Sequence, residues 1–287
     1  MGTFSILNNI AALNAQHQLR VTSINLNQTM SRLASGKRIN SGADDAAGLQ
    51  IADSLRANIR AIDQAVRNAN DGISAGQIAD GALQEVTNIL TRAVTLAEEA
   101  ATGTMDSTSR ASLDAEFNQI EAEIARIAAQ TNFNGVSLFT QAGLNGSLST
   151  YVGDIFNSSS ISVTINTITA SGSTVTSLGG QDLTTVVLST QSGAVASLSV
   201  IKSALIGVAT ARASIGAGMN RLQSAVSVLQ SQSINTQNAE STIRDANMAE
   251  EISNLTKYQI LSQAGIAALS QANATSQSIL ALLRNQG

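Results

Sequence analysis

Few residues in this sequence have the type and spacing that chemistry requires. Asp44 and Asp45 stand together in the stretch NSGADDAAG (40–48) and could serve as paired carboxylates for acid–base catalysis. No base or nucleophile accompanies them, so a structural role is favoured. The chain has one histidine, His17, and no cysteine, which excludes a multi-histidine metal site, a thiolate ligand and a cysteine nucleophile. We therefore predict no catalytic residue, no metal and no cofactor.

The same stretch has the residues that begin a helix. Ser41 or Asp44 is expected to cap a long helix through a side-chain oxygen, and Asp44 and Asp45 suit the positive end of its dipole. Lys37 and Arg38 precede them. These two bases either form ion pairs with such acids between subunits or remain solvated.

A glycine cluster, GAG at 216–218, is a weak match to a phosphate-binding loop. Such a loop requires a preceding strand, whereas the flanking residues here follow a helical repeat. Close helix packing or local flexibility is the favoured interpretation.

Apolar residues recur at alternating steps of three and four along most of the chain. This spacing is typical of helices that pack as coiled coils. The sequence contains no proline to interrupt a helix, and one from 193 to 240 would be roughly 70 Å long. The repeats fall in four runs: 52–73, 83–97, 113–127 and 198–229. Together they predict a coiled-coil-like bundle.

The middle of the chain, 136–189, has a different character. It is rich in Ser, Thr, Gly, Val and Ile, and SISVTINTIT (160–169) alternates apolar and polar residues with period two. Turn signals flank this segment at Asn145-Gly146 and Gly179-Gly180. We predict a small β element inserted between helices.

Both ends of the chain are apolar on more faces than one partner helix can cover. A helix that is apolar nearly all round needs burial on all sides. Ser, Gln and Asn fill the gaps rather than Lys or Arg, which disfavours an anionic membrane surface. We therefore expect other copies of the chain to cover these ends. The apolar positions assigned to this assembly surface are Leu19, Leu26, Met30, Leu33, Ile252, Leu255, Ile266, Leu269, Leu280 and Leu283.

Composition narrows the function further. The net charge of −4 gives no general basic footprint for nucleic acid. We find no run of 18 apolar residues, so no membrane span is predicted. The start, MGTFSILNN, lacks the basic and apolar regions of a cleaved secretory signal.

Three stretches of the sequence resemble bacterial flagellins. LASGKRINSGADDAAGLQIADSLRANIRA (33–61) is similar to the N-terminal signature of that family. The segment from SIGAGMNRLQ (214–223) to ANATSQSILALLR (272–284) resembles the matching C-terminal end. QTNFNGVSLF (130–139) resembles the place where helices give way to a β-hairpin. One departure is Ser276, where many relatives carry proline.

The resemblance implies a mainly α fold: a long coiled-coil-like helical bundle with both termini paired, plus a small inserted β-hairpin region. An inner coiled-coil domain would comprise 1–43 and 243–287. A helical bundle domain would comprise 44–135 and 190–242, and a β-rich insertion, 136–189, would lie at the outer surface.

The resemblance also implies a function. Family members are structural subunits that polymerise into the extracellular flagellar filament, and type III export without a cleaved signal peptide delivers them. The expected partners are other copies of the chain, an export chaperone at the C-terminal helix, and the filament cap and hook-junction proteins. Two alternatives are a hook–filament junction protein, which the 33–61 signature disfavours, and a monomeric adhesin or immune ligand.

Three residues match positions that contact Toll-like receptor 5 in receptor-activating flagellins: Arg92, Leu96 and Glu116. The match is partial, because Thr91 and Thr95 replace the Gln and Glu of activating relatives. The alternative is that the three are ordinary residues of the bundle.

Overall fold

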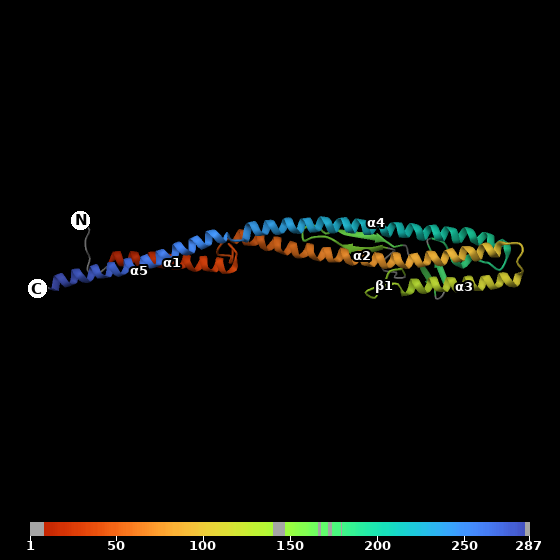
Figure 1. The fold of residues 1–287 in the computed structure, drawn as a ribbon, viewed down its shortest axis with the longest axis horizontal. Helices are drawn as coiled ribbons and strands as arrows, with labels where there is room; N and C mark the ends of the chain where they lie inside the picture. The colour runs from red at the N-terminus through yellow and green to blue at the C-terminus, as the bar shows by residue number, and fades with distance from the viewer. Residues whose placement is uncertain (1–8, 140–146, 166–167, 172–173, 179, 285–287) are drawn as a thin grey trace. The chain divides into compact units, whose positions relative to one another are not determined.

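The computed structural model describes residues 9–139, 147–165, 168–171, 174–178 and 180–284 (Figure 1). For residues 169–171, 174–177, 276 and 278–284 it describes the backbone alone. The predicted mainly α fold is confirmed. Five helices dominate the chain: α1 (Ile10–Ser35), α2 (Ala46–Ala101), α3 (Ser107–Gln130), α4 (Gln191–Arg244) and α5 (Met248–Arg284).

The β region between α3 and α4 is a series of short hairpins. They pair β1 (Asn132–Phe133) with β2 (Val136–Ser137), β3 (Ser147–Tyr151) with β4 (Ser160–Thr164), and β5 (Thr169–Ser171) with β6 (Thr174–Ser177), all antiparallel. A short 3-10 helix, η1 (Leu183–Thr185), follows. The predicted turn at Asn145-Gly146 lies outside the described residues.

The chain divides into two compact units. Unit 1 comprises Met1–Arg56 and Thr236–Gly287, and unit 2 comprises Ala57–Asn235. These limits fall inside α2 and α4, thirteen residues after the boundary expected at 43 and seven residues before the boundary expected at 243.

Unit 2 is a bundle around the heptad seams that the sequence shows. α2 and α4 pack antiparallel: Arg212 pairs with Asp80, while Met219 lies against Gly76. α3 packs alongside them, as Figure 1 shows, and the buried seam residues join into one core. The seam includes Ile62, Leu83, Leu90, Phe117, Ile124, Ile201, Val208, Ile215 and Leu222.

The hairpin β3–β4 adds to this core through its inward side. Val163 is fully buried and half-buried Ile161 packs against the core, which confirms the period-two pattern of the segment. The hairpin β1–β2 turns through Asn134 and Gly135, both with positive φ (50° and 78°). An Asn-Gly pair suits such a tight turn because both residues adopt this conformation at low cost.

Within the described residues, α4 is the one helix long and apolar enough to cross a membrane by length and composition, and 33% of its most apolar window is buried. A core helix meets the same criteria. Its buried stripe belongs to the core of unit 2.

Candidate assembly surfaces

The helices α1 and α5 of unit 1 pack along one seam. Leu19, Leu26 and Leu33 of α1 are half-buried, as are Leu255 and Leu269 of α5. The two backbones approach closely at Gly265, where an added Cβ would lie 2.8 Å from Cδ1 of Leu19. The predicted pairing of the chain ends therefore uses the predicted leucines.

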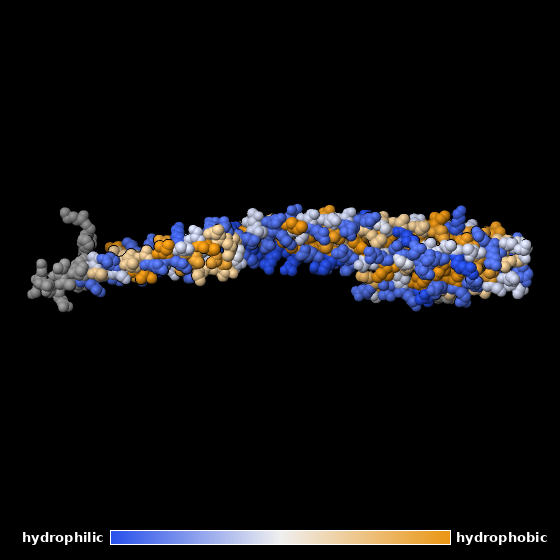
Figure 2. Space-filling model, viewed as in Figure 1, coloured by the Kyte–Doolittle hydropathy of each residue, from blue (hydrophilic) through white to orange (hydrophobic). Residues whose placement is uncertain are grey.

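The flanks of this seam are apolar and uncovered. Met30 of α1 is 53% exposed, and Ile252 and Ile266 of α5 are 52% and 54% exposed. Figure 2 shows apolar side chains on the visible surface of this helix pair. Other large apolar residues exposed on α1 and α5 are Ile10, Leu13, Val21, Ile24, Met248, Ile260 and Leu261. The side chains of Leu280 and Leu283 lie outside the described residues. Pairing within one chain thus satisfies one stripe of α5 and leaves another in water.

A short connector links α1 to α2 and contacts the start of α5. Gly36 ends α1 in the left-handed conformation (φ 69°), which glycine adopts without strain. Its carbonyl accepts a hydrogen bond from Ala246 N at 3.0 Å, and Arg38 N donates to the carbonyl of Arg244 at 2.7 Å. These bonds fix the path of the connector against the α4–α5 junction within unit 1.

Lys37 and Arg38 form no ion pair with any residue that the structure describes. The Arg38 guanidinium instead donates to the carbonyl of Ile243 at 2.7 Å. Pairing of either base with an acid of a neighbouring subunit stays a prediction.

The two aspartates of the connector have separate roles. Asp44 Oδ2 accepts hydrogen bonds from Ser41 N at 2.9 Å, Ser41 Oγ at 3.1 Å and Asn40 N at 3.2 Å. The bond from the Ser41 amide is the main cause that lowers the pKa of Asp44. Asp45 Oδ1 accepts from Gly48 N at 2.8 Å and thereby caps α2. The prediction that Ser41 or Asp44 caps this helix is wrong, because both are engaged in the preceding turn.

Sequence reasoning missed a group of charged residues in unit 1. Arg32 of α1 lies 3.6 Å from Glu251 of α5 and 3.9 Å from Asp44. Arg244 lies 3.2 Å from Asp53 and 3.9 Å from Glu240. Arg244 is largely shielded from water, with 10% of its side chain exposed, so its charge requires the nearby acids, whereas Arg32 is 31% exposed. No local pattern in the sequence brings these partners together, since they come from separate helices.

The three residues matched to receptor contacts lie together in unit 2 but differ in accessibility. Arg92 of α2 and Glu116 of α3 are exposed and joined by an ion pair of 2.8 Å. Leu96 is fully buried in the core and therefore cannot contact a receptor while the bundle is folded. Its predicted contact role is wrong for this conformation. Receptor contact through Arg92 and Glu116 stays a prediction.

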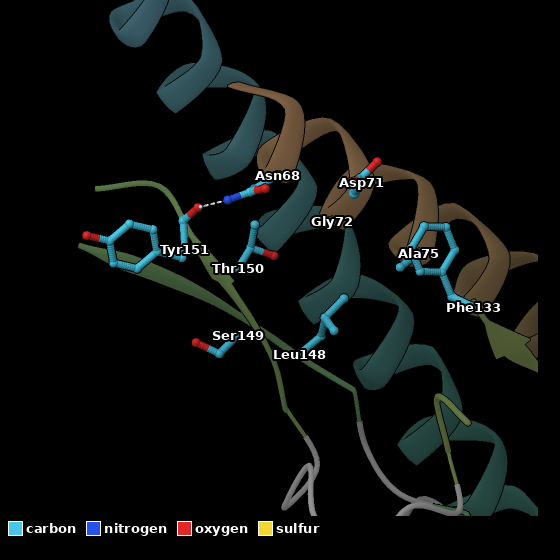
Figure 3. Close-up of a pocket in the computed structure, with 9 residues that line it drawn as sticks. All are labelled: Asn68, Asp71, Gly72, Ala75, Phe133, Leu148, Ser149, Thr150 and Tyr151. Atoms are coloured by element: carbon cyan, nitrogen blue, oxygen red, sulfur yellow. Dashed lines mark hydrogen bonds between the residues drawn. The ribbon is translucent and has the colours of Figure 1, made fainter. Parts of the chain in front are cut away.

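A shallow depression of about 230 Å³ lies where the hairpin β3–β4 meets α2 (Figure 3). Asn68 donates a hydrogen bond to the carbonyl of Tyr151 at 3.2 Å across its rim. Asp71 is the one carboxylate among the lining residues, and no histidine or basic residue accompanies it. The depression therefore lacks an acid–base pair. Its lining comprises Asn68, Asp71, Gly72, Ala75, Phe133, Leu148, Ser149, Thr150 and Tyr151.

Comparisons with known proteins identify the class to which this helical chain belongs. Residues 6–143 match the bacterial flagellin N-terminal helical region, and residues 198–283 match the bacterial flagellin C-terminal helical region. The chain belongs to the bacterial flagellin family.

Individual relatives agree over nearly the whole chain. It is 36% identical over 287 residues to the "Flagellar filament 31.3 kDa core protein" of Treponema maltophilum, which covers 97% of this chain and 99% of the relative. It is 39% identical over 283 residues to a "Flagellin" of Halalkalibacterium halodurans, again covering 97% and 99%. A candidate flagellar hook-associated protein from Vibrio parahaemolyticus has a similar fold (TM-score 0.55, 15% identity), covering 70% of this chain and 100% of that structure.

Proposed function

We propose that this chain is a structural subunit that polymerises into the bacterial flagellar filament. The observation that carries this proposal is the exposed apolar surface of the α1–α5 pair. Half-exposed large apolar residues such as Met30, Ile252 and Ile266 gain stability only when another surface covers them. In a polymer, α1 and α5 of adjacent copies supply that cover. The filament lies outside the cell, so the subunit is an exported protein.

The energetics favour assembly through many small contributions. Full burial of an isoleucine or leucine side chain contributes about 1.5–3 kcal/mol, so covering the exposed half contributes about 1 kcal/mol each. Ile252 and Ile266 together would then contribute about 2 kcal/mol, or roughly 30-fold in the critical concentration for polymerisation.

The test is seeded polymerisation of the purified chain, followed by light scattering and electron microscopy. The wild type is expected to form filaments above a critical concentration. The variant Ile252→Gln/Ile266→Gln is expected to raise that concentration roughly 30-fold, because it removes apolar surface that assembly would bury. Circular dichroism should show unchanged helix content, since glutamine is a good helix former.

The matched control is Ile252→Leu/Ile266→Leu. It keeps the apolar area and nearly the volume, so its critical concentration should stay close to that of the wild type. A wild-type chain that stays monomeric at every concentration and salt tested would refute the proposal. Equal behaviour of the Gln and Leu variants would refute the role of this surface.

The same apolar surface of α5 supports a second partner before assembly. We infer that an export chaperone covers Ile252 and Ile266 while the subunit is still inside the cell, since these side chains otherwise promote premature association. The Gln and Leu variants again form the test. The affinity for the chaperone should fall in the double glutamine variant and stay close to the wild-type value in the double leucine variant.

The proposal also expects contacts with the filament cap and the hook-junction proteins at the two ends of the polymer. Such proteins would meet the faces that a neighbouring subunit covers elsewhere in the filament. A hook-junction role for this chain itself predicts short, self-limited assemblies in the same experiment, whereas a filament subunit should elongate without limit from a seed.

A further inference from the structure

The exposed side of α4 in unit 2 carries basic but no acidic residues. Residues 191–239 contain no Asp or Glu. Arg212 is paired with Asp80 at 2.8 Å, whereas Lys202 and Arg221 are exposed and form no ion pair with any described residue. Over about thirteen helical turns, this helix therefore presents only uncompensated positive charge to solvent.

The same side of α4 carries exposed apolar residues. Val195, Ile206 and Val228 are 57%, 55% and 65% exposed. Their separations of eleven and twenty-two residues place them along one line of the helix. Ile206 and buried Ile215 are nine residues apart and so point to opposite sides, about 180° apart. This line thus faces away from the core. On that side of the helix, an apolar residue gains no stability from burial within its own chain.

Unpaired negative charge is displayed on another helix of the same unit. Asp71, Glu85 and Glu99 of α2 are exposed, and they form no ion pair within the described part of the chain. They follow one another at intervals of fourteen residues, which is the same position of every second heptad. Between 71 and 99 the one basic residue, Arg92, is already paired with Glu116, and the unpaired exposed Arg67 lies before that stretch. The unpaired charges of these stretches of α2 and α4 are therefore separated by sign.

We propose that the basic face of α4 packs against the acidic face of α2 in a second copy of this chain. The basic face is Val195, Lys202, Ile206, Arg221 and Val228, and the acidic face is Asp71, Glu85 and Glu99. This inference rests on the proposed function and names one of the surfaces that would hold the filament together.

The charge pattern selects this arrangement over a symmetric one. Two basic faces in contact would oppose like charges, which disfavours an isologous α4–α4 dimer. When the basic face of one subunit contacts the acidic face of another, the pair still has one free basic face and one free acidic face. Such a contact propagates into an open helical polymer unless the rotation closes a ring.

The test uses charge reversal on each face of the full chain and measures elongation from wild-type seeds. Lys202→Glu/Arg221→Glu is expected to lower the elongation rate about tenfold at about 0.1 M salt, because complementary charge acts mainly on association rates. Glu85→Lys/Glu99→Lys should do the same. The combination of all four changes, seeded with its own fragments, should return to within about threefold of the wild type.

Salt and a control variant separate this effect from a change in net charge. At about 1 M salt the Debye length falls to about 3 Å, so either paired variant should approach the wild-type rate. The control, Arg60→Glu/Arg67→Glu, changes the net charge as the α4 variant does but alters exposed residues that precede the acidic stretch 71–99 on α2. The elongation rate of this control should stay within about twofold of the wild-type rate.

Each outcome bears on the inference. A four-residue variant slower than either pair alone would show that the two faces do not meet, and would overturn it. An α4 variant as fast as the wild type would overturn it while leaving the proposed function intact. A wild type that never elongates would overturn both.

Discussion

Gly216 and Gly218 lie two residues apart in α4 and so point to nearly opposite sides of the helix, where the structure gives them different environments. A Cβ added at Gly216 would meet no atom within 4 Å. A Cβ added at Gly218 would lie 2.9 Å from both γ carbons of Val163 and 3.2 Å from its Cβ. We therefore expect Gly216→Ala to stabilise the protein and Gly218→Ala to destabilise it relative to Gly216→Ala.

The magnitude follows from two opposing effects. Replacing glycine by alanine in a helix interior stabilises it by about 1 kcal/mol, and both variants share that gain. Gly218→Ala also overpacks the core, which typically costs about 1–3 kcal/mol. Val163 is fully buried and its branched Cβ restricts rotation, so the side chain cannot move aside at low cost. Since the helix gain cancels, Gly218→Ala should be about 2 kcal/mol less stable than Gly216→Ala.

The assay is thermal unfolding followed by circular dichroism at 222 nm, with urea unfolding as a second measure. For a unit of this size, 2 kcal/mol corresponds to a Tm difference of about 4–8 °C. Val163→Ala removes both γ carbons, so in that background the two glycine variants should converge. Equal stabilities of Gly216→Ala and Gly218→Ala in the wild-type background would refute the reasoning.

Three further predictions concern the connector and the bundle surface. Asp45→Ala should destabilise the protein by about 1 kcal/mol, measured as a lower Tm, because it removes the hydrogen bond that caps α2 at Gly48 N. The pKa of Asp44 is lowered by its bond from the Ser41 amide, so its contribution is complete above the unfolded pKa and is lost as pH falls through the folded one. Stability measured from pH 5 down to pH 3 should therefore fall more steeply for wild type than for Asp44→Asn, and parallel curves would contradict this. Leu96→Ala should lower the free energy of unfolding by about 2–5 kcal/mol, because Leu96 is fully buried. Arg92→Ala should lower it by about 0.2–1 kcal/mol, because it removes one exposed ion pair. The urea midpoints of unfolding separate the two variants, and equal losses would contradict the burial of Leu96.

Much of the helical architecture was predictable because its signals are local. The run of apolar residues from 198 to 229 predicts a helix over 193–240, and α4 spans Gln191–Arg244. Such a pattern needs no knowledge of the partner, since neighbours three and four residues apart share a face in any helix. The alternation around Val163 predicted a strand for the same reason.

The candidate surfaces were predictable in outline but not in detail. The sequence shows two apolar stripes on α5, yet it does not say which one faces α1. The structure assigns Leu255 and Leu269 to the seam and leaves Ile252 and Ile266 exposed. This choice depends on the rotation of one helix about its axis, which contacts with a distant part of the chain decide.

Other roles were equally undetermined. The sequence predicted that Ser41 or Asp44 caps α2, and only the turn at Asn40–Ser41 shows that both are engaged there while Asp45 caps the helix. By itself, the sequence determined which stretches are helical and the excess of apolar surface at both ends, because these arise from neighbours along the chain. Only the tertiary structure decided which glycine is crowded, which carboxylate caps and which charges stay unpaired, because each depends on atoms that folding brings together from distant residues.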